Sequence, residues 1–321
     1  MSFWDYLLLV PSLALSLALV VPLTGILVRF RANYSPRGLA LDAETGAPSV
    51  PHAGPSLNSY WATAKRVWQL EGGSGFYKGL MPTMITALLM SLVILTFLDA
   101  SPGRHYRPPV TGVLGSLFYG LLLVIVSLPS AIITYRATTT PHKLPYFGLM
   151  KSLRILLTPT ERRRPWIIYL TPGLLAAQFL HTAYITLVLG PLHRVLIPMA
   201  SGPGGVLYPD TTALKFGIYV GIIILSTGLL TPLEVITVRL AIQRNQSSSD
   251  YNSVSQEVEG DAEDVPEYAG AEEDVIGLRN DAEPYTGLID CAKTIVNEEG
   301  VKALYKAAWV TIFGGLASAL G

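Results

Sequence analysis

Apolar residues fill six stretches of this chain, and polar segments separate them. Each stretch is long enough, or nearly so, to cross the hydrocarbon core of a bilayer, which is about 30 Å thick. A helix satisfies its own backbone hydrogen bonds in lipid, so the pattern predicts an all-α membrane protein. We place the six transmembrane helices near residues 3–28, 80–98, 109–135, 168–192, 213–238 and 304–321.

A proline lies inside the first, third and fifth stretches, and an arginine follows each one seven residues later. After a polar loop comes a glutamate and then a tyrosine, as in Glu71–Tyr77 and Glu299–Tyr305. Three copies of one layout predict three two-helix repeats with pseudo-threefold symmetry. The predicted units are 1–100, 108–198 and 212–321, and their proline and arginine pairs are Pro22 and Arg29, Pro129 and Arg136, and Pro232 and Arg239.

Each polar loop contains a short stretch with helical periodicity, at residues 57–70, 146–157 and 288–297. Such a helix can lie in the membrane interface with its lysine on the aqueous side. The alternative is an ordinary loop helix. The first two loops are rich in arginine and lysine, so the positive-inside rule puts the three loops in one compartment and both termini in the other.

Composition agrees with a membrane protein, since 50% of the 321 residues are hydrophobic, 14% are charged and the mean hydropathy is +0.42. The net charge is zero but unevenly distributed: residues 245–284 hold 12 of the 23 acids and one base. We expect most of the insert 244–284 to be disordered. It is either a tolerated insertion or a binding segment for a basic protein partner.

Few residues of the sequence suggest a metal, cofactor or catalytic site. One cysteine, Cys291, excludes a disulfide framework within the chain, and the five histidines are scattered, so we expect no metal site and no cofactor. The sequence contains no nucleophile–base spacing and no phosphate-binding loop, which argues against an enzyme. The basic residues flank membrane spans without an aromatic platform, so nucleic-acid binding is not expected.

The layout resembles that of the mitochondrial carrier (solute carrier) family over essentially the whole chain. Unit three carries Pro232, Glu234 and Arg239, followed by Glu299-Gly300 and Tyr305-Lys306; unit one carries Glu71-Gly72 and Tyr77-Lys78-Gly79. The resemblance implies three repeats around a central path and a ring of ion pairs that closes the matrix side. It also implies a monomer and a location in a mitochondrial membrane, inner or outer.

The chain departs from the family at that ring. The acid positions hold Thr24, Ala131 and Glu234, so one acid is left. The base positions hold Leu27, Thr134 and Thr237, so no base is left. Ion pairs inside a membrane are costly and persist where a gate needs a breakable contact. The sequence therefore predicts that the usual switch is missing.

The resemblance places the central substrate site at Thr86, at Ala176 and Ala177, and at Gly314. His181 and Tyr184 lie one turn further along the fourth helix. These positions offer no arginine or lysine, which favours a small neutral or weakly polar solute over an anion. His181 has a second interpretation, as a histidine hydrogen-bonded between helices.

The turns Tyr77-Lys78-Gly79 and Tyr305-Lys306 resemble the cardiolipin-binding turn of the family, since free helix N–H groups and a lysine suit a phosphate. The alternative is a packing turn. Two functions remain open on the sequence. The first is translocation of a small solute; the second is a non-transporting adaptor or membrane-organising role, with a protein partner bound through the acidic insert.

Overall fold

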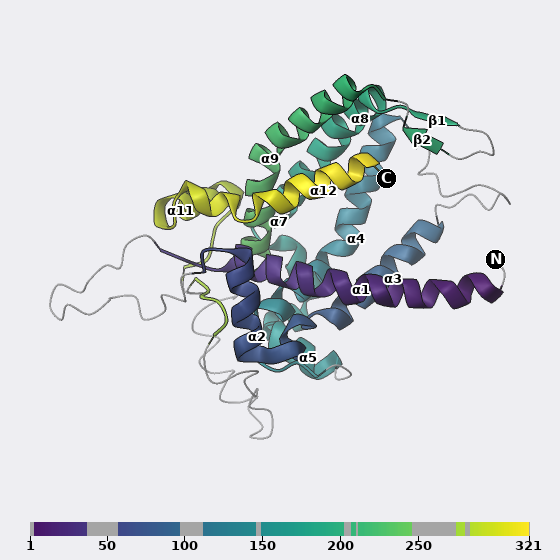
Figure 1. Ribbon diagram of the computed structural model, residues 1–321. Helices are drawn as coiled ribbons and strands as arrows, with labels where there is room; N and C mark the ends of the chain where they lie inside the picture. Colours follow the sequence, from purple (N-terminus) through teal and green to yellow (C-terminus); the bar gives the residue numbers. More distant parts are fainter. Residues whose placement is uncertain are drawn as a thin grey trace, which may run out of the picture.

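The computed structural model describes residues 3–36, 57–96, 112–145, 149–201, 207–209, 211–245, 274–279 and 283–320. Helices dominate this part of the chain, as predicted (Figure 1). Each of the six predicted spans coincides with one long helix or helical run. These are α1 (Phe3–Ala32), α3 (Leu80–Thr96), α4 (Val113–Thr139), α7 (Leu174–Tyr184) continued by η2 (Ile185–Leu189) and α8 (Gly190–Leu196), α9 (Ala213–Ile242) and α12 (Ala308–Leu320).

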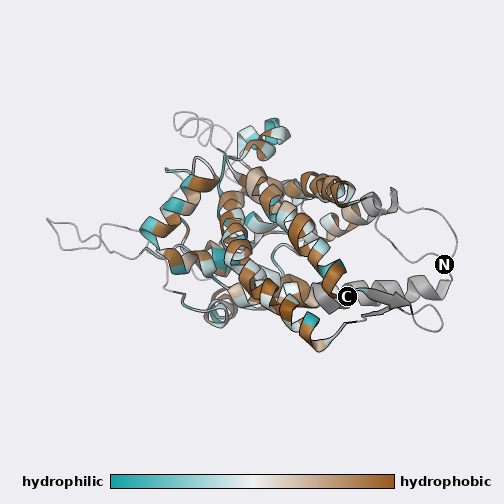
Figure 2. Ribbon diagram, turned by 90° about the horizontal axis from the view of Figure 1, so that it is seen from above, coloured by the Kyte–Doolittle hydropathy of each residue, from teal (hydrophilic) through white to brown (hydrophobic). Residues whose placement is uncertain are grey.

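Four of these are long and apolar enough to cross a membrane, namely Leu15–Ala32, Val113–Thr139, Leu174–Leu196 and Ala213–Ile242. The helices α3 and α12 are shorter, at 17 and 13 residues. Figure 2 shows apolar residues along the long helices and hydrophilic residues gathered on the short helices at one end. Large apolar side chains such as Leu114 and Leu225 are exposed on the long helices, which suits a surface that faces lipid.

Short helices connect the long ones on the loop side, which carries the ends of α1, α4 and α9. They are α2 (Tyr60–Phe76), α5 (Leu149–Leu156), α6 (Pro159–Arg163), η1 (Pro165–Leu170), α11 (Leu288–Glu298) and η3 (Val301–Tyr305). The predicted amphipathic segments 57–70, 146–157 and 288–297 overlap α2, α5 and α11. Local signals explain the boundaries: Ser59 caps the start of α2, and Thr158 with Glu161 forms a capping box at α6.

One small feature is not helical. Strands β1 (Met199–Ser201) and β2 (Leu207–Pro209) pair antiparallel between α8 and α9. The sequence between them is rich in glycine and includes a proline, which favours a chain reversal over a helix. Helical periodicity does not predict this ribbon, because each strand has three residues, too few for an alternating pattern to show.

The end of the acidic insert forms part of the core. Val275 and Ile276 are buried with Val28, Ala32 and Val238. These two apolar residues follow a long acidic run, so the composition of the insert hid their packing. The order at 274–279 is a finding that the expectation for 244–284 did not include, and residues 246–273 and 280–282 lie outside the described residues.

Candidate functional site: the closed end of the bundle

The first, third and fifth membrane helices, α1, α4 and α9, are here called the odd helices, and each contains a proline. A proline leaves the carbonyl four residues earlier without its helix hydrogen bond. In all three places a tyrosine hydroxyl supplies the missing donor. The donors and acceptors are Tyr77 to Ala18 O (3.4 Å), Tyr169 to Ile125 O (3.1 Å) and Tyr305 to Gly228 O (3.1 Å). The prolines at 22, 129 and 232 therefore stay inside unbroken helices in lipid, where an unpaired carbonyl is costly.

The arginine seven residues after each proline binds a glutamate of its own loop. The three pairs are Arg29–Glu71 (2.6 Å), Arg136–Glu161 (2.7 Å) and Arg239–Glu299 (2.8 Å). All six side chains are at most 3% exposed. A buried charge persists only where it is paired and hydrogen-bonded, so each pair fixes the end of an odd helix against its loop.

Cations also join each odd-helix end to a neighbouring unit. Lys78 Nζ, Arg136 and Arg239 donate to the last carbonyl groups of α4, α9 and α1, which lie at the negative ends of these helices. The contacts are Lys78 to Thr140 O (2.9 Å), Arg136 to Gln243 O (2.6 Å), Arg239 to Asn33 O (2.6 Å) and Lys306 to Asn33 O (2.5 Å). The bonds run from unit one to two, from two to three and from three to one, so they close a circle.

The carboxylate of Glu161 lies outside the membrane-spanning helices. Its burial alone would raise its pKa, but hydrogen bonds and the charge of Arg136 hold the pKa below the ordinary value of 4.5. Backbone donors of Thr158 and Asn245 act in the same direction. Glu161 therefore stays ionised at every physiological pH, and its ion pair does not switch.

A separate polar cluster lies where α1, α7, α9 and α12 meet. Glu234 Oε2 accepts from Arg31 (2.5 Å) and from the hydroxyl of Thr311 (2.6 Å). Its other oxygen is 3.5 Å from His181 Nε2. The side chains of Glu234 and His181 are 24% and 25% exposed, in contrast to the dry pairs of the loops. This cluster can break and re-form at lower cost than a fully buried pair.

Arg31 changes the prediction about the gate. The sequence shows no base at the expected position on α1, because Leu27 stands there, and the expectation was a missing switch. The structure places the guanidinium of Arg31, one helical turn further on, against Glu234 of α9. One junction, between α1 and α9, is thus bridged after all. The clue in the sequence was the arginine four residues after Leu27, on the same helix face.

The residues predicted for the central site are only partly brought together. His181 meets Glu234, and the hydroxyl of Tyr184 is 2.9 Å from that of Ser226 on α9. Thr86 donates to Pro82 O within its own helix. Ala177 is buried, whereas Ala176 and Gly314 are exposed. Among the described residues, no hydrogen bond joins these last four positions to the Glu234 cluster. Thr311 and Ser226 were not predicted from the sequence, because an isolated hydroxyl on a helix leaves no recognisable pattern.

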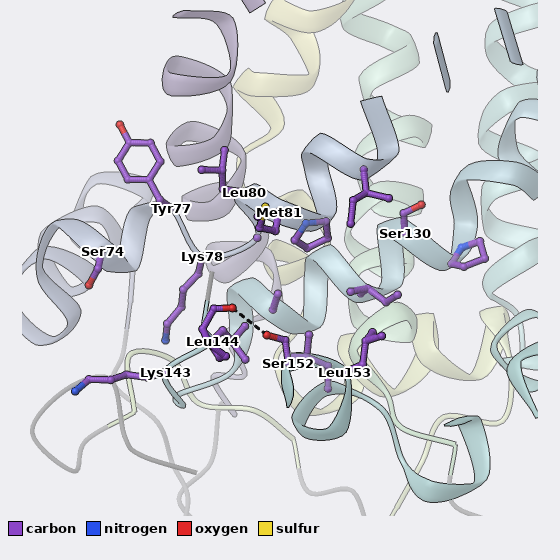
Figure 3. A pocket seen from close by; sticks show the side chains of 18 of the residues that line it. Ser74, Tyr77, Lys78, Leu80, Met81, Ser130, Lys143, Leu144, Ser152 and Leu153 are labelled. Atoms are coloured by element: carbon purple, nitrogen blue, oxygen red, sulfur yellow. Dashed lines mark hydrogen bonds between the residues drawn. The ribbon is translucent and has the colours of Figure 1, made fainter. Parts of the chain in front are cut away.

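The two predicted lipid-binding turns each border a cavity. A cavity of about 470 Å³ is lined by Tyr77, Lys78 and Gly79 together with residues of α3, α4 and α5. Figure 3 shows Lys78 and Lys143 on one side of it and Met81 and Ser130 on the other. A second cavity of about 530 Å³ lies at Tyr305 and Lys306, beside the start of α2.

The lysines of these turns are already engaged. Lys78 Nζ contacts Glu71, and Lys306 Nζ is 3.2 Å from Glu299. Both ammonium groups thus serve the loop ion pairs, a role that the resemblance did not suggest. Binding of a lipid at the turns stays a prediction.

Between the second and third units, the turn at Gly173 packs closely against the start of α11. Gly173 begins α7 with a positive φ of 77°, and a Cβ built on it would lie 2.2 Å from the backbone nitrogen of Leu288. The start of α7 and the start of α11 therefore touch backbone to backbone. Only glycine permits both the conformation and this approach.

Together, the fold and the site define a multi-pass helical membrane protein whose bundle is closed at one end by ion pairs. Comparison with known proteins supports a family. The sequence model described as "Mitochondrial carrier protein" matches residues 211–320. The "Calcium-binding mitochondrial carrier protein" of Dictyostelium discoideum is 26% identical over 263 residues, which cover 79% of this chain and 27% of that protein.

These two matches support a divergent member of the mitochondrial carrier family. The chain spans about a quarter of the length of this curated relative (27%). The family implies the six-helix carrier fold, in agreement with the six helical spans described above. The boundaries of the three units, 1–100, 108–198 and 212–321, stay predictions.

Proposed function

We propose that this protein translocates a small neutral or weakly polar solute across a mitochondrial membrane, as a monomer. The observation that supports this most is the bridge between Arg31 and Glu234, which joins unit one to unit three. A carrier needs a contact that holds one end closed and can be broken. Glu234 is 24% exposed in this pair, and its other carboxylate oxygen lies 3.5 Å from His181 Nε2, so the bridge meets that requirement better than the dry loop pairs.

The solute class follows from the side chains around the predicted path. Thr86, Ala176, Ala177 and Gly314 carry no charge, and Arg31 is neutralised by Glu234. Without a free cation, a di- or tricarboxylate would lose its hydration without replacement. The hydroxyl of Tyr184 and the imidazole of His181 can instead exchange single hydrogen bonds with a neutral solute.

The experiment is a thermal-shift screen of the purified protein in mild detergent with cardiolipin, against mitochondrial metabolites and cofactors. A bound solute raises the melting temperature by mass action. A shift that disappears in Thr86→Trp and His181→Trp, but persists in the surface variant Asp290→Asn, supports a central solute site. Uptake of the same solute into liposomes, reduced in Glu234→Gln, then tests translocation.

For the lipid, we propose that the cavities at Tyr77-Lys78-Gly79 and Tyr305-Lys306 bind cardiolipin. Both cavities are lined by residues of these turns next to the start of a helix, and the positive end of a helix suits a phosphate. Stabilisation by cardiolipin, but not by phosphatidylcholine of matched chain length, supports this proposal. Equal stabilisation by both lipids contradicts it.

A second candidate is a non-transporting adaptor or membrane-organising protein. The supporting observation is that the gate positions on α1 and α4 hold Thr24, Leu27 and Thr134, and the first and last of these bond carbonyls of their own helices. Two of the three junctions thus lack a charged switch at these positions. If no solute shifts the melting temperature and deletion of 247–272 abolishes capture of a basic protein partner, this function is favoured.

A further inference from the structure

Residues 274–279, here called the strap, cross from unit three to unit one at the loop-side end of the bundle. Gly277 accepts from the amide of Tyr34 (2.8 Å) and donates to Asn33 Oδ1 (3.0 Å). Arg66 of α2 donates to Val275 O (3.1 Å) and Asp274 O (3.2 Å). The strap is therefore held by backbone bonds to the end of α1 and by a side chain of α2.

The other end of the strap is fixed to unit three. Arg279 pairs with Glu298 of α11 (3.0 Å), and its guanidinium lies 5.0 Å from the ring centre of Tyr285. The strap is thus anchored on both sides of the junction between the first and third units. A segment anchored in this way resists separation of the two units.

The apolar side chains of the strap reach the centre of the closed end. Val275 and Ile276 are 5% and 4% exposed. Their cluster includes Val28 and Ala32 of α1 and Val238 of α9, with Tyr135 of α4 packed against it. One cluster thus contains residues of all three proline-containing helices, and the strap closes it from the loop side.

We propose that the strap is an intramolecular clamp that holds α1, α4 and α9 together at the loop-side end and must leave before this end can open. The proposal goes beyond translocation, since it concerns the opening of the bundle and not the solute. The bridge between Arg31 and Glu234 ties one junction only. The circle of cations joins the helix ends of all three units, and the strap adds apolar packing and hydrogen bonds to this closure. Its release would expose two apolar side chains and leave four backbone groups without their present partners, all within one continuous segment.

The clamp can be tested by releasing it and measuring two quantities. Ile276→Asp places a carboxylate in the apolar cluster, and the double variant Val275→Ala/Ile276→Ala weakens the same contact more gently. Leu278→Asp is the matched control, because Leu278 belongs to the strap and is 38% exposed. Hydrogen exchange at the amides of Tyr34 and Gly277 reports docking of the strap directly.

The opening is measured by pulsed electron spin resonance between labels at Ser74→Cys and Arg244→Cys in nanodiscs. Native Cys291 can stay in place, since it is fully buried and its burial raises the pKa of the thiol to about 12. We expect exchange at the two amides to rise at least tenfold in both release variants and the distance distribution to gain a longer population. Leu278→Asp should match the unmodified protein in both measurements.

Fast exchange with an unchanged distance in the release variants would overturn the clamp. The strap would then have left its site without any opening of the bundle, so its docking would not hold the helices together. Unfolding of the whole bundle in even the gentle double variant would also overturn it, because the strap would be inseparable core. If opening is seen and no solute passes into liposomes, the clamp stands and the proposed translocation fails.

Discussion

The hydroxyl of Tyr305 donates to the carbonyl oxygen of Gly228, the acceptor that Pro232 leaves without a partner in α9. Tyr305 and Gly228 are 77 positions apart, and the bond ties the end of η3, just before α12, to the middle of α9. Equivalent bonds in the other two units show that proline and tyrosine act as a pair. The carbonyl that a proline leaves unpaired in a membrane helix thus receives its hydrogen bond from outside the helix, from a tyrosine that precedes the second membrane helix of the same unit.

Tyr305→Phe should lower the free energy of unfolding by about 1 kcal/mol, because the carbonyl of Gly228 loses its donor. In a Pro232→Ala background the new amide can bond that carbonyl, so the same tyrosine change should cost close to nothing. Thermal or denaturant unfolding of the four proteins gives the coupling energy. Additive effects would show that the hydroxyl does not serve the proline.

Arg136→Met should destabilise the protein by about 3–5 kcal/mol, because Glu161 is left charged and buried. Arg136→Met/Glu161→Gln should recover part of this loss, since the unpaired charge is gone. The measurement is the unfolding midpoint of both variants in the same detergent. A double variant that is less stable than the single variant would contradict the pairing.

The ion pair of Glu161 should also set a pH dependence. Its pKa is lowered in the folded state, so the unfolded chain binds the proton more readily, and the stabilisation exists above the ordinary value of 4.5. The stabilisation disappears as the pH falls through the lowered pKa of the folded state. The difference in melting temperature between the unmodified protein and Glu161→Gln should therefore shrink as the pH drops below about 4.5. A difference that is constant from pH 7 to pH 3 would argue against this.

Gly173→Ala should be much more damaging than Gly72→Ala. Both glycines have a positive φ, at 77° and 66°, so alanine is strained at either, by about 1 kcal/mol. Only Gly173 has a backbone atom, the Leu288 nitrogen, within 2.2 Å of the added Cβ, whereas Gly72 has nothing within 4 Å. We expect about 3 kcal/mol for Gly173→Ala, measured as the loss in unfolding free energy. Equal losses would mean that α7 and α11 can move apart freely.

Much of the fold was predictable from sequence, for identifiable reasons. The six spans follow from apolar length alone, and the prolines with their arginines predict three units. The bridge of Arg31 to Glu234 was missed because the search was confined to the position of Leu27, although a helix presents residue 31 on the same face. Contacts of single hydroxyls, such as Thr311 with Glu234, depend on how helices meet and leave no pattern in the chain.

The acidic insert shows where composition misleads. Twelve acids predicted a disordered segment, yet Val275 and Ile276 at its end are core residues. Two apolar side chains in a long polar segment change the mean hydropathy of that segment very little. Their importance depends on a groove formed by α1, α2 and α9, which only the tertiary structure creates.

The circle of cations at the helix ends also bears on how the chain folds. Asn33 near the start of the sequence receives its donors from Arg239 and Lys306, which lie 206 and 273 residues later. The end of the first helix therefore cannot reach its final state until the last unit has been made and inserted. Such distant contacts slow folding and leave an early intermediate with unsatisfied carbonyl groups. The carbonyl of Asn33 should thus stay without these two donors until unit three is in place.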